Sequence, residues 1–167
     1  MKEIFQVINE LVADKVIDTY AVGGAIAAHF YIGAFATFDI DIFFPVAARS
    51  TSLLDLGPLY EHLRLKGYLP KGEMIQIAGW DIQFLPTFDD LTDEAVQNAV
   101  YFDVDGEQVR VMKAKYLVAI ALKTGRSKDL ARVNMFLDEG KVNKESVEQL
   151  VKKFGLETQW QKYQNLT

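Results

Sequence analysis

The chain has 167 residues, of which half are hydrophobic and a quarter are charged, and its net charge is -5. This length and composition predict one globular domain with a substantial apolar core, and argue against an intrinsically disordered chain. The negative charge argues against a protein that binds nucleic acid over its whole surface, because phosphate binding needs clustered Lys and Arg. The sequence contains no cysteine, which excludes disulfides, thiolate nucleophiles and Cys-ligated zinc.

The first segment, residues 2–14, carries apolar residues at helical spacing between charged ones. This pattern predicts an amphipathic helix and differs from a signal peptide, which needs a continuous apolar stretch. No segment approaches the roughly 18 consecutive apolar residues that a membrane span requires. We therefore expect a cytoplasmic protein without a membrane partner.

The next segment has the pattern of a strand, a turn and a helix. Residues 20–22 form a short apolar run that ends in Gly23-Gly24, and the small apolar residues 25–32 suit a buried helix. Glycines at the start of a helix leave its backbone N–H groups open to a phosphate. The alternative interpretation of Gly23-Gly24 is a tight turn with no ligand.

Residues 38–44, FDIDIFF, alternate acidic and apolar residues and then become wholly apolar, which predicts a strand that Pro45 ends. Leucines at helical spacing predict a helix over residues 52–66. Two hairpins follow, each with a tight turn typical of paired strands. Their strands are expected at 74–77 with 80–85, and at 100–104 with 108–112.

From residue 112 the pattern is helical, with segments at 116–123, 128–137, 144–154 and a weaker one around Trp160. Strands and helices alternate in the first part of the chain, and helices dominate the last part. This order predicts an α/β (α+β) fold, in which helices flank a mixed sheet. We expect an α/β core over residues 1–112 and a helical C-terminal region, residues 113–167, packed on the same domain.

Asp39 and Asp41 lie two residues apart on a strand, so their side chains share one face. The apolar residues around them indicate a central strand, although the solvent side of an edge strand is the alternative. Two carboxylates on such a strand need a compensating cation, and Mg²⁺ prefers carboxylates together with water and phosphate oxygens. The pair therefore predicts a magnesium site that binds a nucleotide.

Asp81 is the candidate third carboxylate. In the strand Trp80–Phe84 it shares one face with Gln83, and a strand next to that of Asp39 would bring it to the metal ions. There it could ligate one ion and help to deprotonate an attacking hydroxyl. The alternative is an exposed acid of a hairpin.

The ordered set of Gly-Gly, a helix, Asp-x-Asp on a strand and a lone Asp on a later strand resembles the nucleotidyltransferase superfamily, which has a polymerase-beta-like fold. The segment Met112–Leu130 is similar to the second signature of its AbiEii-like branch, the minimal nucleotidyltransferases of type IV toxin-antitoxin systems. Together these resemblances cover about residues 18 to 137.

The resemblance implies a nucleotidyltransferase-like mixed sheet and the transfer of a nucleoside monophosphate from an NTP such as ATP to an acceptor hydroxyl. The acceptor would be RNA, for example tRNA, or a protein, and an antitoxin would be a partner. Two Mg²⁺ ions would be held by Asp39, Asp41 and Asp81. Nucleotide contacts are implied for Gly23, Gly24, Thr37, Arg126, Lys128 and Asp129, and Lys123 for a triphosphate or structural contact.

One position departs from the branch pattern, because Phe35 stands where an Arg is expected before the Asp-x-Asp. This departure leaves open a second interpretation, a catalytically inactive nucleotidyltransferase-like binding or regulatory module. Other residues have plain alternatives as well. Lys123 and Arg126 could belong to a solvated helix end. Lys128 and Asp129 could form a surface pair or cap the next helix. The acidic run Asp89, Asp90, Asp93 and Glu94 is interpreted as solvated surface.

The acceptor leaves no signature in the sequence. An RNA acceptor would be favoured if the cations of the second signature formed one face beside the aspartates. These cations are Lys113, Lys115, Lys123, Arg126, Lys128 and Arg132.

Overall fold

The computed structural model describes residues 1–33, 37, 39–46 and 56–166. Within them, seven strands form a single sheet in the order β3-β4-β5-β2-β1-β7-β6. The strands are β1 Ala21–Val22, β2 Asp39–Phe44, β3 Pro70–Lys71, β4 Met74–Ile77, β5 Trp80–Pro86, β6 Val100–Val104 and β7 Glu107–Val111. The sheet is mixed, because β2 runs parallel to β5 and antiparallel to β1. The expected α/β class and both expected hairpins are confirmed.

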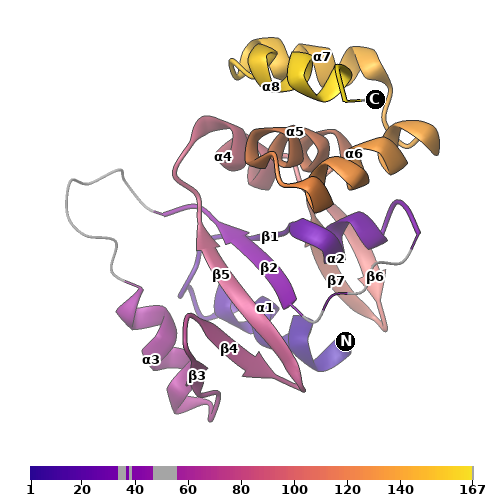
Figure 1. The fold of residues 1–167 in the computed structure, drawn as a ribbon. Helices are drawn as coiled ribbons and strands as arrows, with labels where there is room; N and C mark the ends of the chain where they lie inside the picture. The colour runs from indigo at the N-terminus through magenta and orange to yellow at the C-terminus, as the bar shows by residue number, and fades with distance from the viewer. Residues whose placement is uncertain (34–36, 38, 47–55, 167) are drawn as a thin grey trace.

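Helices cover the sheet and extend beyond it. They are α1 Lys2–Ala13, α2 Gly24–His29, α3 Gly57–Leu65, α4 Asp90–Gln97, α5 Ala114–Thr124, α6 Ser127–Asp138, α7 Lys144–Lys153 and α8 Glu157–Gln164. Figure 1 shows α4 to α8 gathered at the top, with α7 and α8 farthest from the strands. Helix α5 joins this group to the core, since it contacts α2 and α4 as well as α6, α7 and α8.

Helix α3 begins at Gly57, and residues 52–55 of the helix expected there lie outside the described part of the chain. No helix within the described ranges combines the length and apolar character needed to cross a membrane.

Strand β2 occupies a central position, as the sequence predicts, and has two chemically different faces. Ile40, Ile42 and Phe44 are buried on one face, and the residues between them are only half-buried on the other. The apolar face packs into the core and anchors the strand there. Parallel strands such as β2 and β5 are usually covered on both faces of the sheet. The opposite face, which carries Asp39 and Asp41, is thereby fixed in position beneath α2, α5 and α6.

The acidic run after β5 is not simply solvated surface, which corrects the interpretation given above. Asp89 is the N-cap of α4, and its Oδ1 accepts a hydrogen bond from the Thr92 backbone N–H at 3.1 Å. The apolar stripe Leu91, Ala95 and Val96 of this helix is buried. Four of the nine residues 89–97 are acidic and hide this short stripe in the sequence, so the helix is missed.

Asp89→Ala is expected to destabilise the protein by about 1–2 kcal/mol, because it leaves an N–H of α4 without its cap. It also removes the ion pair of Asp89 with Lys123, whose Nζ lies 3.0 Å from Oδ2. Urea unfolding measures the effect. Asn143→Ala, which removes the N-cap of α7, should cost a similar amount. Gln97→Ala, at the exposed end of α4, should be neutral, and a loss equal to that of Asp89→Ala would contradict the capping account.

Candidate functional site

Parallel pairing of β2 and β5 brings four polar side chains to one face of the sheet. Asp39 lies opposite Asp81, and Asp41 lies opposite Gln83. The strand of Asp81 is therefore the direct neighbour of the strand that carries the aspartate pair, as the sequence predicts. Residues paired in this way point to the same side of a sheet.

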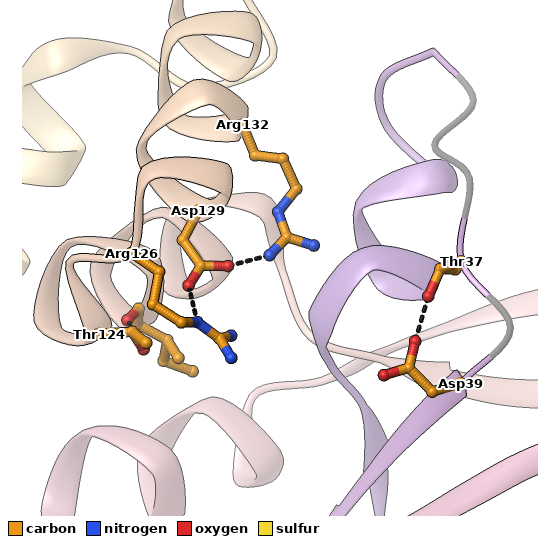
Figure 2. A network of polar contacts seen from close by, with 7 residues as sticks. Thr37, Asp39, Thr124, Arg126, Asp129 and Arg132 are labelled. Atoms are coloured by element: carbon orange, nitrogen blue, oxygen red, sulfur yellow. Dashed lines mark hydrogen bonds and ion pairs between the residues drawn. The ribbon is translucent and has the colours of Figure 1, made fainter.

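A cavity of about 410 Å³ lies between this face and the helices α2, α5 and α6. Thr37, Asp39 and Asp41 line one side of it, and Arg126, Lys128, Asp129 and Arg132 line another. Figure 2 shows the two groups facing each other, with Thr37 and Asp39 hydrogen-bonded on one side and Asp129 between two arginines on the other. The rest of the lining is mostly apolar and comes from α2, α5, α6 and the strands. Acidic and basic side chains thus oppose each other across one space.

Asp41 is held in an environment that opposes its ionisation. Burial, and then the negative charge of Asp39, raise the pKa of Asp41 from its ordinary value of 3.8 to about 6. The cationic side chains of Arg132, Arg126 and Lys128 counteract part of this rise. A group in this state gains most from an added cation, because a nearby positive charge favours the carboxylate.

The two glycines have a structural purpose that the sequence does not reveal. A Cβ on Gly24 would lie 1.9 Å from Oδ2 of Asp41, and Gly24 has φ of +60°. A Cβ on Gly23 would lie 2.4 Å from the ring of Phe43. Gly23 also donates its backbone N–H to the carbonyl oxygen of Asp41 at 2.9 Å. The glycines therefore admit the side chains of β2, and Gly24 also lines the cavity.

Asp81 lies beside Asp39 in the sheet, but its carboxylate contacts other residues. Its oxygens lie 3.5 Å from Nζ of Lys71 and 3.5 Å from Nε2 of Gln76. Within the described ranges, no three His, Cys, Asp or Glu side chains are grouped so as to hold a metal ion. Asp81 is also absent from the cavity lining. The structure thus brings the Asp39 and Asp41 carboxylates to the cavity but not that of Asp81.

Lys123 and Gly23 also lie outside the lining of the cavity. Lys123 borders a smaller pocket near the start of α4, where it pairs with Asp89. This position favours the structural contact over the triphosphate contact, the two roles that the resemblance implies for Lys123. Three of the six cations considered for an RNA-binding face, Arg126, Lys128 and Arg132, line the cavity. Phe35, the departure from the branch pattern, lies outside the described residues.

Arg132, Gln83 and Thr124 line the cavity but are not among the predicted site residues. Arg132 lies three residues after Asp129 on α6, and Arg126, the N-cap residue of this helix, lies three residues before Asp129, so the three side chains meet on one side of the helix. That spacing is the signal by which the sequence could have included Arg132.

No family model matches the chain, and no curated protein matches it significantly. Solved structures do resemble it. A crystal structure of ANT(2")-Ia in complex with adenylyl-2"-tobramycin has a TM-score of 0.56 at 16% identity, covering 90% of this chain and 95% of that one. The chain has a nucleotidyltransferase-like fold. This fold is also that of a solution structure of the antibiotic-resistance factor ANT(2'')-Ia, with a TM-score of 0.56 at 16% identity over 98% of this chain and 97% of that one.

A crystal structure of an antigenic nucleotidyltransferase-like protein from Paracoccidioides brasiliensis has a TM-score of 0.56 at 14% identity. It covers 91% of this chain and 87% of that one. These matches span nearly the whole of both chains, so the nucleotidyltransferase-like fold includes the helical C-terminal layer. The fold class expected from the resemblance is confirmed.

Proposed function

We propose that the protein transfers a nucleoside monophosphate from an NTP to an acceptor hydroxyl and releases pyrophosphate. The observation that carries the proposal is the cavity in which Asp39 and Asp41 face Arg126, Lys128 and Arg132. Carboxylates suit divalent cations, and guanidinium and ammonium groups suit phosphate oxygens. A metal-bound NTP needs both kinds of group on opposite sides, and ATP is the first nucleotide to test.

The donor chemistry of this face fits Mg²⁺, which takes only one or two protein carboxylates and completes its shell with water and phosphate oxygens. Asp39 and Asp41 would hold the ions. Asp81 would join them by leaving Lys71, whose side chain is 65% exposed and forms only a long contact. Such an exposed ion pair contributes little stability, so its loss costs little. Bound Mg²⁺ neutralises charge that develops on the attacking and leaving oxygens.

Residues of the chain would then carry out the proton transfer and stabilise the leaving group. The acceptor oxygen forms a bond to the α-phosphorus, the bond from that phosphorus to the β-phosphate bridge breaks, and pyrophosphate leaves. Asp81 would take the acceptor's proton, by general-base catalysis. Lys128 and the two arginines would stabilise the departing pyrophosphate. Positioning and charge stabilisation account for most of the catalysis in reactions of this class.

The acceptor class is tested separately from the transfer itself. The resemblance to toxin-type enzymes favours tRNA or a protein, with an antitoxin as partner. The ANT(2")-Ia complex contains adenylyl-2"-tobramycin, so a small-molecule hydroxyl is a third class to test. Toxicity on expression in a bacterial host, relieved by Asp39→Ala, would support the toxin assignment.

The deciding experiment measures pyrophosphate release from each NTP with Mg²⁺ and with tRNA, protein extract or tobramycin as acceptor. Wild type should release pyrophosphate with one acceptor, and Asp39→Ala should release none, because it removes a carboxylate from the cavity. Asp18→Asn, which changes an exposed acid outside the cavity lining, should behave as wild type. Equal turnover by the Asp39→Ala protein would reject this site.

A nucleotide-binding module without turnover is the second candidate. It is favoured by the contacts of Asp81 with Lys71 and Gln76, which hold the third carboxylate away from the cavity. A binding module would bind Mg²⁺ and ATP and gain thermal stability from them. It would release no pyrophosphate with any acceptor. The same assay therefore separates the two candidates.

A further inference from the structure

Asp129 is a buried carboxylate that lies between two guanidinium groups. It is only 2% exposed, and its Oδ2 lies 2.5 Å from Nε of Arg126. Its Oδ1 accepts a hydrogen bond from Nη2 of Arg132. A buried carboxylate is unfavourable unless its oxygens are paired. Here both oxygens are paired with arginines, namely Arg132 of helix α6 and Arg126, the N-cap residue directly before that helix.

Both arginines line the cavity, and their charges reach the aspartate face on its other side. They are two of the three cations that favour ionisation of Asp41. The side chain of Arg126 is 60% exposed, whereas that of Arg132 is 13% exposed. An arginine as exposed as Arg126 would sample many rotamers if it were unpaired. Its bond to Asp129 fixes the guanidinium beside the cavity (Figure 2).

Asp129 is poorly suited to contact a nucleotide itself. Its two oxygens already accept charge-assisted hydrogen bonds from the arginines. A carboxylate directed at a triphosphate would also add repulsion between like charges. This argues against the direct nucleotide contact that the resemblance implies for this residue.

We infer that Asp129 is a positioning residue that holds Arg126 and Arg132 as a clamp for the β- and γ-phosphates of the NTP. The inference rests on the proposed function for the identity of the ligand. Guanidinium groups bind phosphates through paired N–H donors whose directions are fixed, so orientation determines the affinity as much as charge. Asp129 supplies that orientation, and the arginines make the contact.

The test measures calorimetric binding of two probes, inorganic tripolyphosphate with Mg²⁺ and AMP with Mg²⁺. Wild type should bind tripolyphosphate, and Asp129→Asn should bind it at least about tenfold more weakly with little change for AMP. Asp89→Asn, which breaks an acid–lysine pair outside the cavity, should bind both probes as wild type does. Unchanged tripolyphosphate binding by Asp129→Asn, or an equal loss for both probes, would overturn the clamp.

Two further variants show whether Asp129 acts through the arginines. If it does, Asp129→Asn should add little to the loss already caused by Arg132→Gln, whereas independent effects would multiply. Arg126→Lys keeps the charge at an exposed position but cannot keep the paired geometry, so it should weaken tripolyphosphate binding several-fold. If Asp129→Asn does not fold, the Arg126→Lys variant tests the inference. Wild-type affinity of Arg126→Lys for tripolyphosphate would overturn the inference.

Failure of this inference and failure of the proposed function give different results. Wild type that binds no tripolyphosphate overturns the clamp whatever its turnover. Wild type that binds tripolyphosphate through the clamp but releases no pyrophosphate keeps the clamp and contradicts only the transfer reaction.

Discussion

Asp41→Asn is expected to abolish nucleotidyl transfer and, without metal or nucleotide, to raise the stability of the protein at neutral pH. The activity is lost because the variant lacks a carboxylate that we assign to the metal ions. Stability rises because the wild-type carboxylate is charged at neutral pH in a place where burial and Asp39 oppose charge. The pKa difference between about 6 in the folded protein and 3.8 corresponds to about 3 kcal/mol, an upper value for the gain.

The pH dependence of this gain has a defined direction. A carboxyl group whose pKa is raised on folding costs nothing below pH 3.8, where it is protonated in both states. The cost to the folded state grows between pH 3.8 and about pH 6, and it is nearly constant above about pH 6. The advantage of Asp41→Asn over wild type should therefore be small near pH 4 and largest above pH 7.

Urea unfolding at several pH values measures this difference. Asp18→Asn, which removes one exposed charge of the same kind, should change stability by less than about 0.5 kcal/mol at every pH. Saturating Mg²⁺ with ATP should stabilise wild type but not Asp41→Asn, because only wild type keeps both carboxylates. An Asp41→Asn protein that is less stable than wild type at pH 7 would contradict the electrostatic account of this site.

The sheet and the first helix could be predicted from local patterns because each pattern has one dominant explanation. The alternation in β2 matches the alternation of buried and half-buried residues, and the turn at Asp105-Gly106 joins β6 to β7. Helix α4 was missed because its acids conceal the buried residues. Strand β3, Pro70–Lys71, was missed because two exposed residues next to a proline carry no pattern.

The site could be predicted as far as backbone pairing determines it. The expectation that Asp81 lies on a strand next to that of Asp39 is confirmed by the register of β2 and β5. The direction of the Asp81 carboxylate depends on Lys71 and Gln76, which come from β3 and β4 and whose approach no local pattern encodes. The sequence shows which positions are charged, but the packing of the strands decides which partner each charged side chain contacts.

Gly24→Ala is expected to destabilise the protein by about 2–5 kcal/mol and to abolish nucleotide-dependent stabilisation. The added methyl group would overlap Oδ2 of Asp41, and the backbone φ of +60° adds strain for any residue other than glycine. The Asp41 carboxylate would have to leave its position opposite the cationic side chains of the cavity. Thermal unfolding with and without Mg²⁺ and ATP measures both effects.

Gly67→Ala separates backbone strain from overlap, because Gly67 has φ of +90° and open space around its Cβ position. This control should cost about 1–2 kcal/mol and keep the nucleotide response. Gly33→Ala, with neither feature, should be neutral. Asp41→Ala removes the overlapping oxygen, so in the Gly24→Ala background it should recover the excess cost and leave only the strain seen at Gly67. Additive costs in this cycle would show that Gly24 is needed for its backbone alone, and that the close approach of Asp41 does not explain the Gly-Gly turn.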